Sequence, residues 1–197
     1  MKRLLIDKDK TEMTVTEFGY KSDQHLELSK AGLNECLDKI ELTGGIMTQK
    51  ITPFLWFDNN AEEAMQFYTS IFKDSKIKNV NRIGETVLTG TLELNGQEIM
   101  VLNGGPRFKF TEAISLFVKC ENQEEVDNYW NKLVDGGEAQ QCGWLKDKFG
   151  LSWQIIPQAL GELLGDKDPA KSKRVMDSML QMKKIDIARL KAAHAGN

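Results

Sequence analysis

The sequence contains few of the residues on which metal, disulfide and nucleic-acid chemistry depend. Only two histidines, His25 and His194, occur among 197 residues, and the three cysteines are Cys36, Cys120 and Cys142. An odd number of widely separated cysteines argues against the disulfide framework of a small secreted protein. The formal net charge of −3 argues against a nucleic-acid-binding surface, which normally carries an excess of Lys and Arg.

Long hydrophobic runs are missing as well. No apolar stretch approaches the roughly 20 residues that a membrane-spanning helix needs. The N-terminus begins with the basic pair Lys2 and Arg3, but its apolar stretch ends at Asp7, which is too early for a signal peptide. We therefore expect a cytoplasmic protein with no nucleic-acid partner, no membrane partner and no cofactor.

The chain does contain an internal repeat. The pattern N-x-E-E-[AV]-x-x, followed by two aromatic residues, occurs at Asn60–Tyr68 and again 62 residues later at Asn122–Trp130. In each copy the Asn can cap a helix with an apolar stripe, and a Glu follows three residues on, as in a capping box. Each copy alone is also compatible with an ordinary amphipathic helix. The apolar, strand-like runs before them, at 51–57 and 113–119, are again 62 residues apart and favour a repeated unit.

Short β-type segments follow each predicted helix. Asn95-Gly96 between two of them is a strong signal for a two-residue hairpin turn. The first set spans 76–83, 86–94 and 97–102, and the second set spans 138–142, 144–146 and 151–156 with a turn at 147–150. Both halves therefore read β-α-β-β-β. We expect an α+β fold in which two such units face a shared concave pocket.

Several stretches resemble the PhnB-like proteins of the vicinal oxygen chelate superfamily, which are often labelled 3-demethylubiquinone 3-methyltransferase-like. These stretches are Ile51–Asp58, Leu102–Phe110, Cys142–Pro157 and, near the C-terminus, Met179–Asp186. The resemblance covers residues 47 to about 193. It implies the paired βαβββ fold of glyoxalase and bleomycin-resistance proteins and, usually, a homodimer.

The repeat and the resemblance together divide the chain into three regions. We expect an N-terminal appendage of a strand plus a helix at 1–46, the paired βαβββ domain at 47–160, and a helical tail at 161–197. The appendage resembles the C-terminal end of an Aha1-like START-type domain, through Thr14–Tyr20 and Leu28–Lys39. In the tail, Asp168 followed by Pro169 predicts the start of one helix, and Asp186 the start of another.

The candidate pocket lacks the metal ligands that the resemblance would suggest. Metal-dependent members of the superfamily bind a divalent ion through His and Glu side chains on the strands, but here Gln154 stands where a Glu often sits. An amide carbonyl is a much weaker ligand for such an ion. We therefore expect a small-molecule pocket without a metal. Its candidate ligand-binding residues are Phe54, Trp56, Asn103, Phe108, Phe110, Ser115, Phe117, Trp144, Trp153 and Gln154.

For the aromatic candidates, packing in the core between sheet and helix is the competing interpretation. The stretch at 103–106 could offer backbone N–H groups to an anion, although a turn that joins the two halves is the simpler interpretation. Arg107 and Lys109 could favour an acidic ligand, or could form a solvated edge.

The sequence identifies no catalytic residue. Cys142 and Cys120 have no nearby imidazole that would activate a thiol, so we interpret both as small, semi-buried hydrophobic residues. Glu98 and Asp58 have no partner visible in the sequence that would tune either carboxyl group as a general base.

Three functions remain open. The favoured one is a PhnB-like protein without the usual metal ligands that binds a small, partly aromatic or anionic molecule, as a binder or as an enzyme. The second is a methyltransferase-type enzyme acting on a quinone-like substrate, which the absence of a G-x-G-x-x-G turn opposes. The third is a metal-dependent lyase or dioxygenase, which the shortage of histidine opposes.

Overall fold

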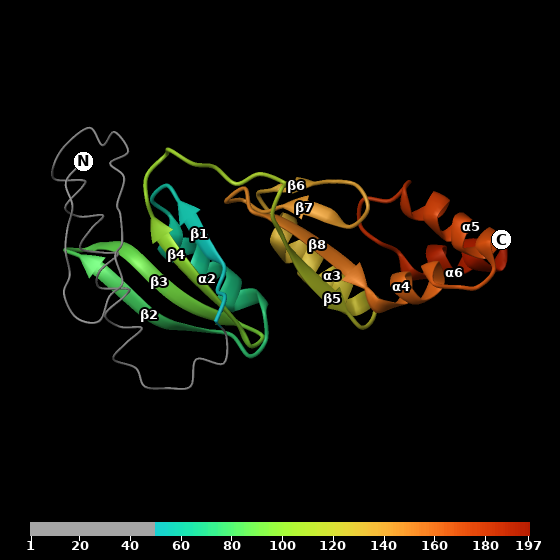
Figure 1. Cartoon of the computed structure of the whole chain (residues 1–197), viewed down its shortest axis with the longest axis horizontal. Coiled ribbons are helices and arrows are strands. Elements are labelled where there is room, and N and C mark those ends of the chain that lie inside the picture. Colours follow the sequence, from blue (N-terminus) through green and yellow to red (C-terminus); the bar gives the residue numbers. More distant parts are fainter. Residues whose placement is uncertain (1–49) are drawn as a thin grey trace, which may run out of the picture. The chain divides into compact units, whose positions relative to one another are not determined.

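The computed structural model describes residues 50–197, which belong to the second of two units of the chain, Gln49–Asn197 (Figure 1). The strand and helix predicted within residues 1–46 lie outside the described residues. The elements of the described part are, in chain order, β1 (Phe54–Phe57), α2 (Ala61–Ile71), β2 (Lys76–Ile83), β3 (Thr86–Leu94), β4 (Gln97–Asn103), β5 (Ser115–Cys120), α3 (Gln123–Val134), β6 (Glu138–Ala139), β7 (Trp144–Lys146), β8 (Ser152–Pro157), α4 (Gln158–Leu164), α5 (Pro169–Met179) and α6 (Ile187–Ala195).

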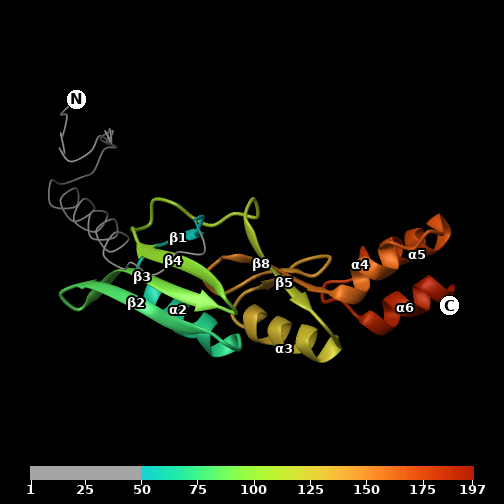
Figure 2. The ribbon, with the colours of Figure 1, turned by 60° about the horizontal axis from the view of Figure 1, so that its bottom comes forward.

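The strands form two four-stranded sheets of the same topology. Their strand orders are β1-β4-β3-β2 and β5-β8-β7-β6, and in each sheet the first strand runs parallel to the last while the other pairs are antiparallel. We call β1 to β4 with α2 the first module, and β5 to β8 with α3 the second (Figures 1 and 2). The expected α+β fold of paired βαβββ units is confirmed.

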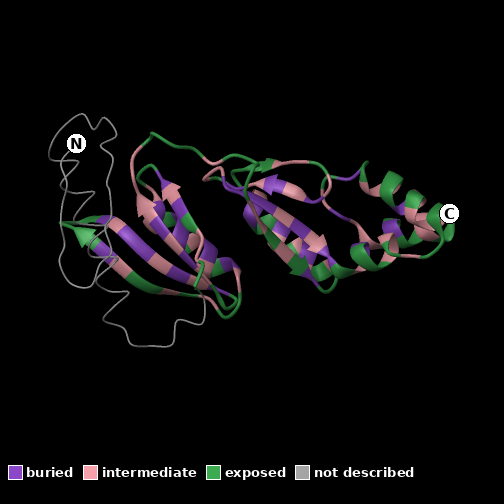
Figure 3. Ribbon diagram, in the orientation of Figure 1, coloured by how far each residue is buried: buried purple, intermediate pink, exposed green. Residues whose placement is uncertain are grey.

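Each sheet has one face against its helix and one open face. In β1, Leu55 and Phe57 are buried in the core beside α2, whereas Phe54 and Trp56 point the other way. This alternation follows from the two-residue period of a strand. The ribbon coloured by burial shows it as alternating bands along the strands (Figure 3). The open faces are therefore where side chains remain accessible to a ligand.

The internal repeat has two different offsets. In the helices the offset is 62, because buried Tyr68 of α2 corresponds to buried Trp130 of α3. In the strands it is 63, because core-facing Phe57 at the end of β1 corresponds to Cys120 at the end of β5. The connection to the helix has three residues in the first module, 58–60, and two in the second, 121–122. Aligning the strands at offset 62 was therefore wrong, since it pairs residues from opposite faces.

The two predicted helix caps also differ. In α3 the Asn122 side chain accepts a hydrogen bond from the Glu125 N–H at 2.9 Å, as the capping-box pattern predicts. The Asn60 side chain makes no such bond at the start of α2. The first N–H of that helix, at Ala61, instead donates to Asn103 Oδ1 at 2.9 Å. A residue distant in sequence has thus taken over the cap.

A buried carboxylate joins the two modules. Asp147, in the turn between β7 and β8, is 2% exposed. Its Oδ2 accepts hydrogen bonds from the Tyr68 hydroxyl of α2 at 2.7 Å and from Trp153 Nε1 at 2.8 Å. Its Oδ1 accepts from the backbone N–H groups of Phe149 at 2.8 Å and Leu151 at 3.0 Å. The joint therefore connects the modules through a helix and a turn, on the helix side of the sheets.

Ring contacts reinforce this joint. Phe72, just after α2, stacks on Trp153 with 5.4 Å between ring centroids and on Tyr129 of α3 with 5.1 Å. Phe67 of α2 meets Phe149 edge-on at 5.7 Å. Such pairs add to the free energy of burial, because edge-on and offset arrangements suit the charge distribution of the rings.

The C-terminal helices form a second, smaller core. It is built from Leu160, Val175, Met182, Ile185 and Leu190. The predicted caps of the last two helices are confirmed. Asp168 accepts from the Ala170 N–H at 2.9 Å, and Asp186 accepts from the Arg189 N–H at 3.0 Å. Within residues 50–197, no helix has both the length and the apolar character that crossing a membrane requires.

Backbone hydrogen bonds and the side-chain amide of Gln123 hold this helical tail against the second module. The N–H groups of Cys142 and Gly143 donate to the carbonyls of Met182 and Lys183, both at 2.8 Å. Gly143 has φ +83°, and a Cβ there would lie 3.0 Å from the Ile155 carbonyl oxygen, so only glycine fits without strain.

Candidate functional site

The predicted site residues separate into two groups on opposite sides of the sheets. Six of them lie on open faces, namely Phe54, Trp56, Ser115, Phe117, Trp144 and Gln154, and Phe108 of the connection between the modules packs against Trp56. Asn103, Phe110 and Trp153 lie on the helix side.

The open face of the second sheet presents a row of two aromatic rings and an amide. Strand register places Gln154 of β8 between Phe117 of β5 and Trp144 of β7. Phe117 is 58% exposed, whereas Leu116 and Val118 beside it pack into the core. Because a strand alternates its side chains, these three residues share one face.

The next row of the same face is polar. Register places Ser152 of β8 between Ser115 of β5 and Lys146 of β7. The two rows are linked, because Gln154 Nε2 donates to Ser115 Oγ at 2.8 Å. Ser115, Ser152 and Gln154 therefore form an uncharged polar cluster between the aromatic rings and the lysine.

Ser152 is a polar residue of this face that the sequence analysis missed. Its side chain is fully buried, and its Oγ has no hydrogen-bond partner among the described residues. A buried hydroxyl without a partner is costly, so such groups commonly mark the position of a water or ligand. The available signal was its spacing, because Ser152 precedes Gln154 by two residues and so shares its face.

The one lysine in these rows is already neutralised. Lys146 Nζ lies 2.5 Å from Glu112 Oε1, in the segment that leads into β5. The hydrogen bond with Lys146 lowers the pKa of the Glu112 carboxyl, and the same bond raises the pKa of the Lys146 ammonium. Both groups therefore stay charged at neutral pH and offset each other.

The open face of the first module is aromatic. Phe54 is 49% exposed, and the Trp56 ring meets Phe108 edge-on with 5.0 Å between centroids. Trp56 Nε1 donates to the Gly105 carbonyl at 2.8 Å, which fixes the ring against the connecting segment. The Arg107 guanidinium lies 5.4 Å from the centre of the Phe108 ring.

The glycines of that segment do not offer their N–H groups to an anion. Gly104 N–H donates to the Phe57 carbonyl at 2.9 Å, and Gly105 N–H donates to the Asp58 carbonyl at 3.0 Å. A Cβ at Gly104 would lie 2.2 Å from the Trp56 ring, so glycine is required there by close approach. The segment acts as a connection that supports Trp56.

The residues on the helix side support the fold. Trp153 is 2% exposed and donates to Asp147. Asn103 caps α2 and donates from Nδ2 to the Val87 carbonyl at 2.9 Å. Phe110 packs edge-on against Phe57 at 5.2 Å. Their hydrogen bonds and ring faces are used within the core rather than on an open face.

The candidate nucleophiles are poorly placed for catalysis. Burial raises the pKa of the Cys120 thiol to about 12, so it remains protonated at neutral pH. The Cys142 Sγ lies 3.9 Å from the Met179 carbonyl oxygen, beside the helical tail. Glu98 lies 2.6 Å from Lys78 Nζ in an ion pair.

The open faces do not fit a divalent metal ion. Over residues 50–197, no three His, Cys, Asp or Glu side chains gather closely enough to hold one. Within the polar cluster on the open face of the second sheet, the side chains that could bind a metal ion offer only hydroxyl and amide groups. Two of them, Gln154 and Ser115, are hydrogen-bonded to each other. Neutral oxygen donors of this kind bind catalytic transition metals weakly.

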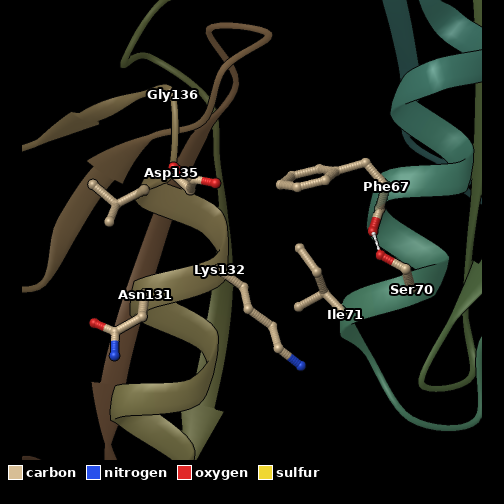
Figure 4. A pocket seen from close by; sticks show the side chains of 8 residues that line it. Phe67, Ser70, Ile71, Asn131, Lys132, Asp135 and Gly136 are labelled. Atoms are coloured by element: carbon tan, nitrogen blue, oxygen red, sulfur yellow. Dashed lines mark hydrogen bonds between the residues drawn. The ribbon is translucent and has the colours of Figure 1, made fainter.

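A separate cleft of about 680 Å³ lies between the two helices (Figure 4). One wall comes from α2 with Phe67, Ser70 and Ile71, and the facing wall comes from α3 and the loop after it. Ser70 Oγ is engaged, since it donates to the Phe67 carbonyl at 2.6 Å. None of the predicted site residues lines this cleft.

Comparison with two solved structures supports the architecture, and a third protein is similar in sequence. The chain is 42% identical to a protein from Bacillus cereus described as a putative 3-demethylubiquinone-9 3-methyltransferase, PhnB protein, with a TM-score of 0.53, over 55% of this chain and 99% of that one. It is 18% identical to a protein from Pseudomonas aeruginosa, with a TM-score of 0.50, over 56% of this chain and 98% of that one. A Staphylococcus aureus protein is 36% identical, with a TM-score of 0.27, over 54% of this chain and 93% of that one.

Family comparison gives the same assignment. No curated protein matches the chain. Residues 49–156, which span both modules and end before α4, match the family described as 3-demethylubiquinone-9 3-methyltransferase. The chain therefore belongs to this PhnB-like family, and its two βαβββ modules form the paired fold that the resemblance predicts.

Proposed function

We propose that this protein binds a small, partly aromatic or anionic molecule on the open faces of its sheets, without a metal ion. The observation that carries the proposal is the hydrogen bond between Gln154 and Ser115 on an open face. The family resemblance implies metal ligands at such strand positions in metal-dependent members. This pair can orient a polar group of a ligand, but it supplies no metal ligand of useful strength.

Exposed aromatic rings support the same proposal. Phe54, Phe108 and Phe117 are each about half exposed and lie on, or beside, the open faces. Apolar side chains that gather on an exposed sheet face form the kind of surface to which a ligand or a partner binds. The rings supply contact area, and the polar cluster supplies orientation.

The proposed assembly is a homodimer in which a second copy of the chain covers part of these faces. Covering the exposed rings would bury apolar surface, which favours association. Sedimentation equilibrium should then give twice the mass of the chain. The substitution Phe117→Asp should shift it toward the monomer, whereas Ile51→Asp, at an exposed apolar residue outside the strands, should not.

The binding proposal is tested by ligand-observed NMR with a set of aromatic fragments and the full-length protein. We expect a subset to bind, and Phe117→Ala and Phe54→Ala to weaken binding several-fold, because each removes a ring from an open face. Ile51→Ala is the matched control and should leave binding unchanged. Fragments that bind all three variants equally well would place the ligand elsewhere and overturn the proposal.

Two added ligands test the other functions. Equilibrium dialysis of untagged protein against zinc or manganese should show far less than one equivalent bound, and near one equivalent would contradict the proposal. Adenosylmethionine should leave the melting temperature unchanged. A stabilisation that rises with its concentration would favour methyl transfer instead.

We further propose a cytoplasmic location, which suits the free thiols of Cys120 and Cys142.

A further inference from the structure

The polar cluster on the second open face has a defined hydrogen-bonding capacity. The bond from Gln154 to Ser115 uses one N–H of the amide and one lone pair of the hydroxyl. The Gln154 carbonyl can still accept a hydrogen bond, and the Ser115 hydroxyl and the second N–H of the Gln154 amide can still donate one each. The cluster therefore presents an acceptor beside donors.

The buried hydroxyl of Ser152 adds a second observation at the same place. It lies in register between Ser115 and Lys146, and its Oγ has no partner among the described residues. A hydroxyl that has left water without gaining a partner retains an unmet demand for a hydrogen bond. A polar group that reaches Ser115 and Gln154 would also approach the strand position of Ser152.

The charges around the cluster disfavour an anion. Lys146, the cation in these two rows, is paired with Glu112. Lys119, further along β5 on the same face, is exposed to solvent, where its field is screened. The free carbonyl oxygen of Gln154 would repel a carboxylate placed against it. An uncharged ligand therefore suits this face better than an acidic one.

The rings on either side set the shape of the ligand. Phe117 and Trp144 flank Gln154 in one row across the sheet. A flat molecule can contact both rings while its edge meets the amide, because aromatic faces and edges pack best with planar partners. The corresponding row of the first module holds Phe54, Met100 and Thr91, with no amide. The feature belongs to the second module alone.

We infer that the second module selects an uncharged, planar ring compound that carries a hydrogen-bond donor next to an acceptor, such as a carboxamide, lactam or imide. This inference rests on the proposed function and narrows its ligand class. The donor of the ligand would donate a hydrogen bond to the Gln154 carbonyl, and its acceptor would accept one from the Ser115 hydroxyl. The Ser152 hydroxyl is enclosed beside this pair, so the ligand contacts of the cluster come from Gln154 and Ser115.

A pair of isosteric probes tests the inference. Isothermal titration calorimetry of the full-length protein would compare 2-naphthamide, which is neutral and both donates and accepts, with 2-naphthoate, which is anionic and only accepts. We expect the amide to bind about tenfold more tightly, because the carboxylate would leave the Gln154 carbonyl without a donor.

Variants connect the preference to the cluster. Ser115→Ala and Gln154→Leu should each weaken 2-naphthamide about tenfold, and Gln154→Leu, which removes the acceptor, should also abolish its preference over 2-naphthoate. Met100→Leu, at the equivalent position of the first module, is the matched control and should change neither affinity. Circular dichroism would check that each variant is folded, and the small Ser115→Ala change keeps the test usable if Gln154→Leu is not.

The outcomes separate this inference from the proposed function. If both probes bind equally to the wild type and Phe117→Ala weakens both, the open face binds ring compounds but the inferred ligand class is wrong. Unchanged amide affinity in both cluster variants would also overturn the inference. If neither probe binds at ~1 mM and the fragment set also fails, the proposed function falls with it.

Discussion

At the scale of single residues, Asp147 has an unusual environment for a carboxylate. It is buried and accepts four hydrogen bonds, but those bonds come from neutral donors. Burial raises the pKa of Asp147 above its ordinary value of 3.8, and the hydrogen bonds from Trp153, Tyr68 and the backbone only partly oppose this shift. Its charged neighbours pair elsewhere: Lys148 with Glu63, and Lys146 with Glu112. The ionised form is therefore tolerated rather than favoured.

This environment predicts a pH dependence of stability. Because the folded state raises the pKa of Asp147, the folded protein holds this proton more tightly than the unfolded chain does. The contribution of Asp147 to stability should therefore fall as the pH rises from about 4 through the folded pKa, by at most about 1.4 kcal/mol per pH unit. The measurement is urea denaturation of the wild type and of Asp147→Asn at several pH values.

The difference between wild type and Asp147→Asn isolates this one group from the other carboxyls. We expect that difference to shrink as the pH rises, since the variant has no proton to lose there. Asp135→Asn, at an exposed loop position, is the control and should follow the wild type at every pH. A wild-type advantage that grew with pH would contradict the prediction.

At the scale of elements, the start of α2 depends on a residue from another element. Asn103, at the end of β4, accepts from the first N–H of the helix and donates to the Val87 carbonyl of β3. Its amide thereby ties a helix to two strands. Asn60, the cap that the sequence pattern predicts, has no such bond.

We expect Asn103→Ala to reduce the free energy of unfolding by about 1–2 kcal/mol, since it removes a cap and leaves a backbone carbonyl without its donor. Asn60→Ala should cost less than half as much. Asn122→Ala, at the cap of α3, should cost about 1 kcal/mol and calibrates the comparison. Urea denaturation measures all three, and an equal loss for Asn60→Ala and Asn103→Ala would refute the assignment.

At the scale of the whole described unit, the helical tail depends on the amide of Gln123 as well as on backbone pairing. Gln123 Nε2 donates to the Ile185 carbonyl at 3.1 Å, and Gln123 Oε1 accepts from the Ile187 N–H at 2.9 Å. A surface ion pair, Lys184 with Asp127, lies beside them. Because exposed ion pairs contribute little, the amide should matter more.

Gln123→Ala should loosen the tail without unfolding the modules. We expect faster hydrogen–deuterium exchange at residues 182–190, because the N–H of Ile187 loses its acceptor and the local opening free energy falls. Gln158→Ala, which loses only an exposed bond to Glu162, is the control. Unchanged exchange in Gln123→Ala, or equally faster exchange in the β3–β4 hairpin, would argue against a local fastening.

Much of the architecture follows from local patterns in the sequence. The hairpin strands of the first module fall almost where the alternation predicts, and Asn95-Gly96 forms their turn with φ values of 46° and 82°. The caps at Asn122, Asp168 and Asp186 form as predicted. These features depend on residues within a few positions of one another, so short-range chemistry is sufficient to specify them.

The candidate site was less accessible to sequence reasoning. Phe54, Ser115, Phe117, Trp144 and Gln154 were assigned to a pocket wall by the repeat and the resemblance, and all five lie on open faces. Trp153 differs from Gln154 by a single position, yet it lies on the other side of the sheet. A one-residue change in strand phase exchanges the two faces, and composition does not reveal it.

The sequence by itself determined the two βαβββ units, their helices and most of their turns, because these follow from period, capping and turn chemistry. Only the tertiary structure decided which side of each strand is open, since that depends on connections of three residues before α2 and two before α3. It alone also decided that Asn103 caps a distant helix and that Asp147 joins the modules. Those contacts link residues far apart in the chain, and no local pattern encodes them.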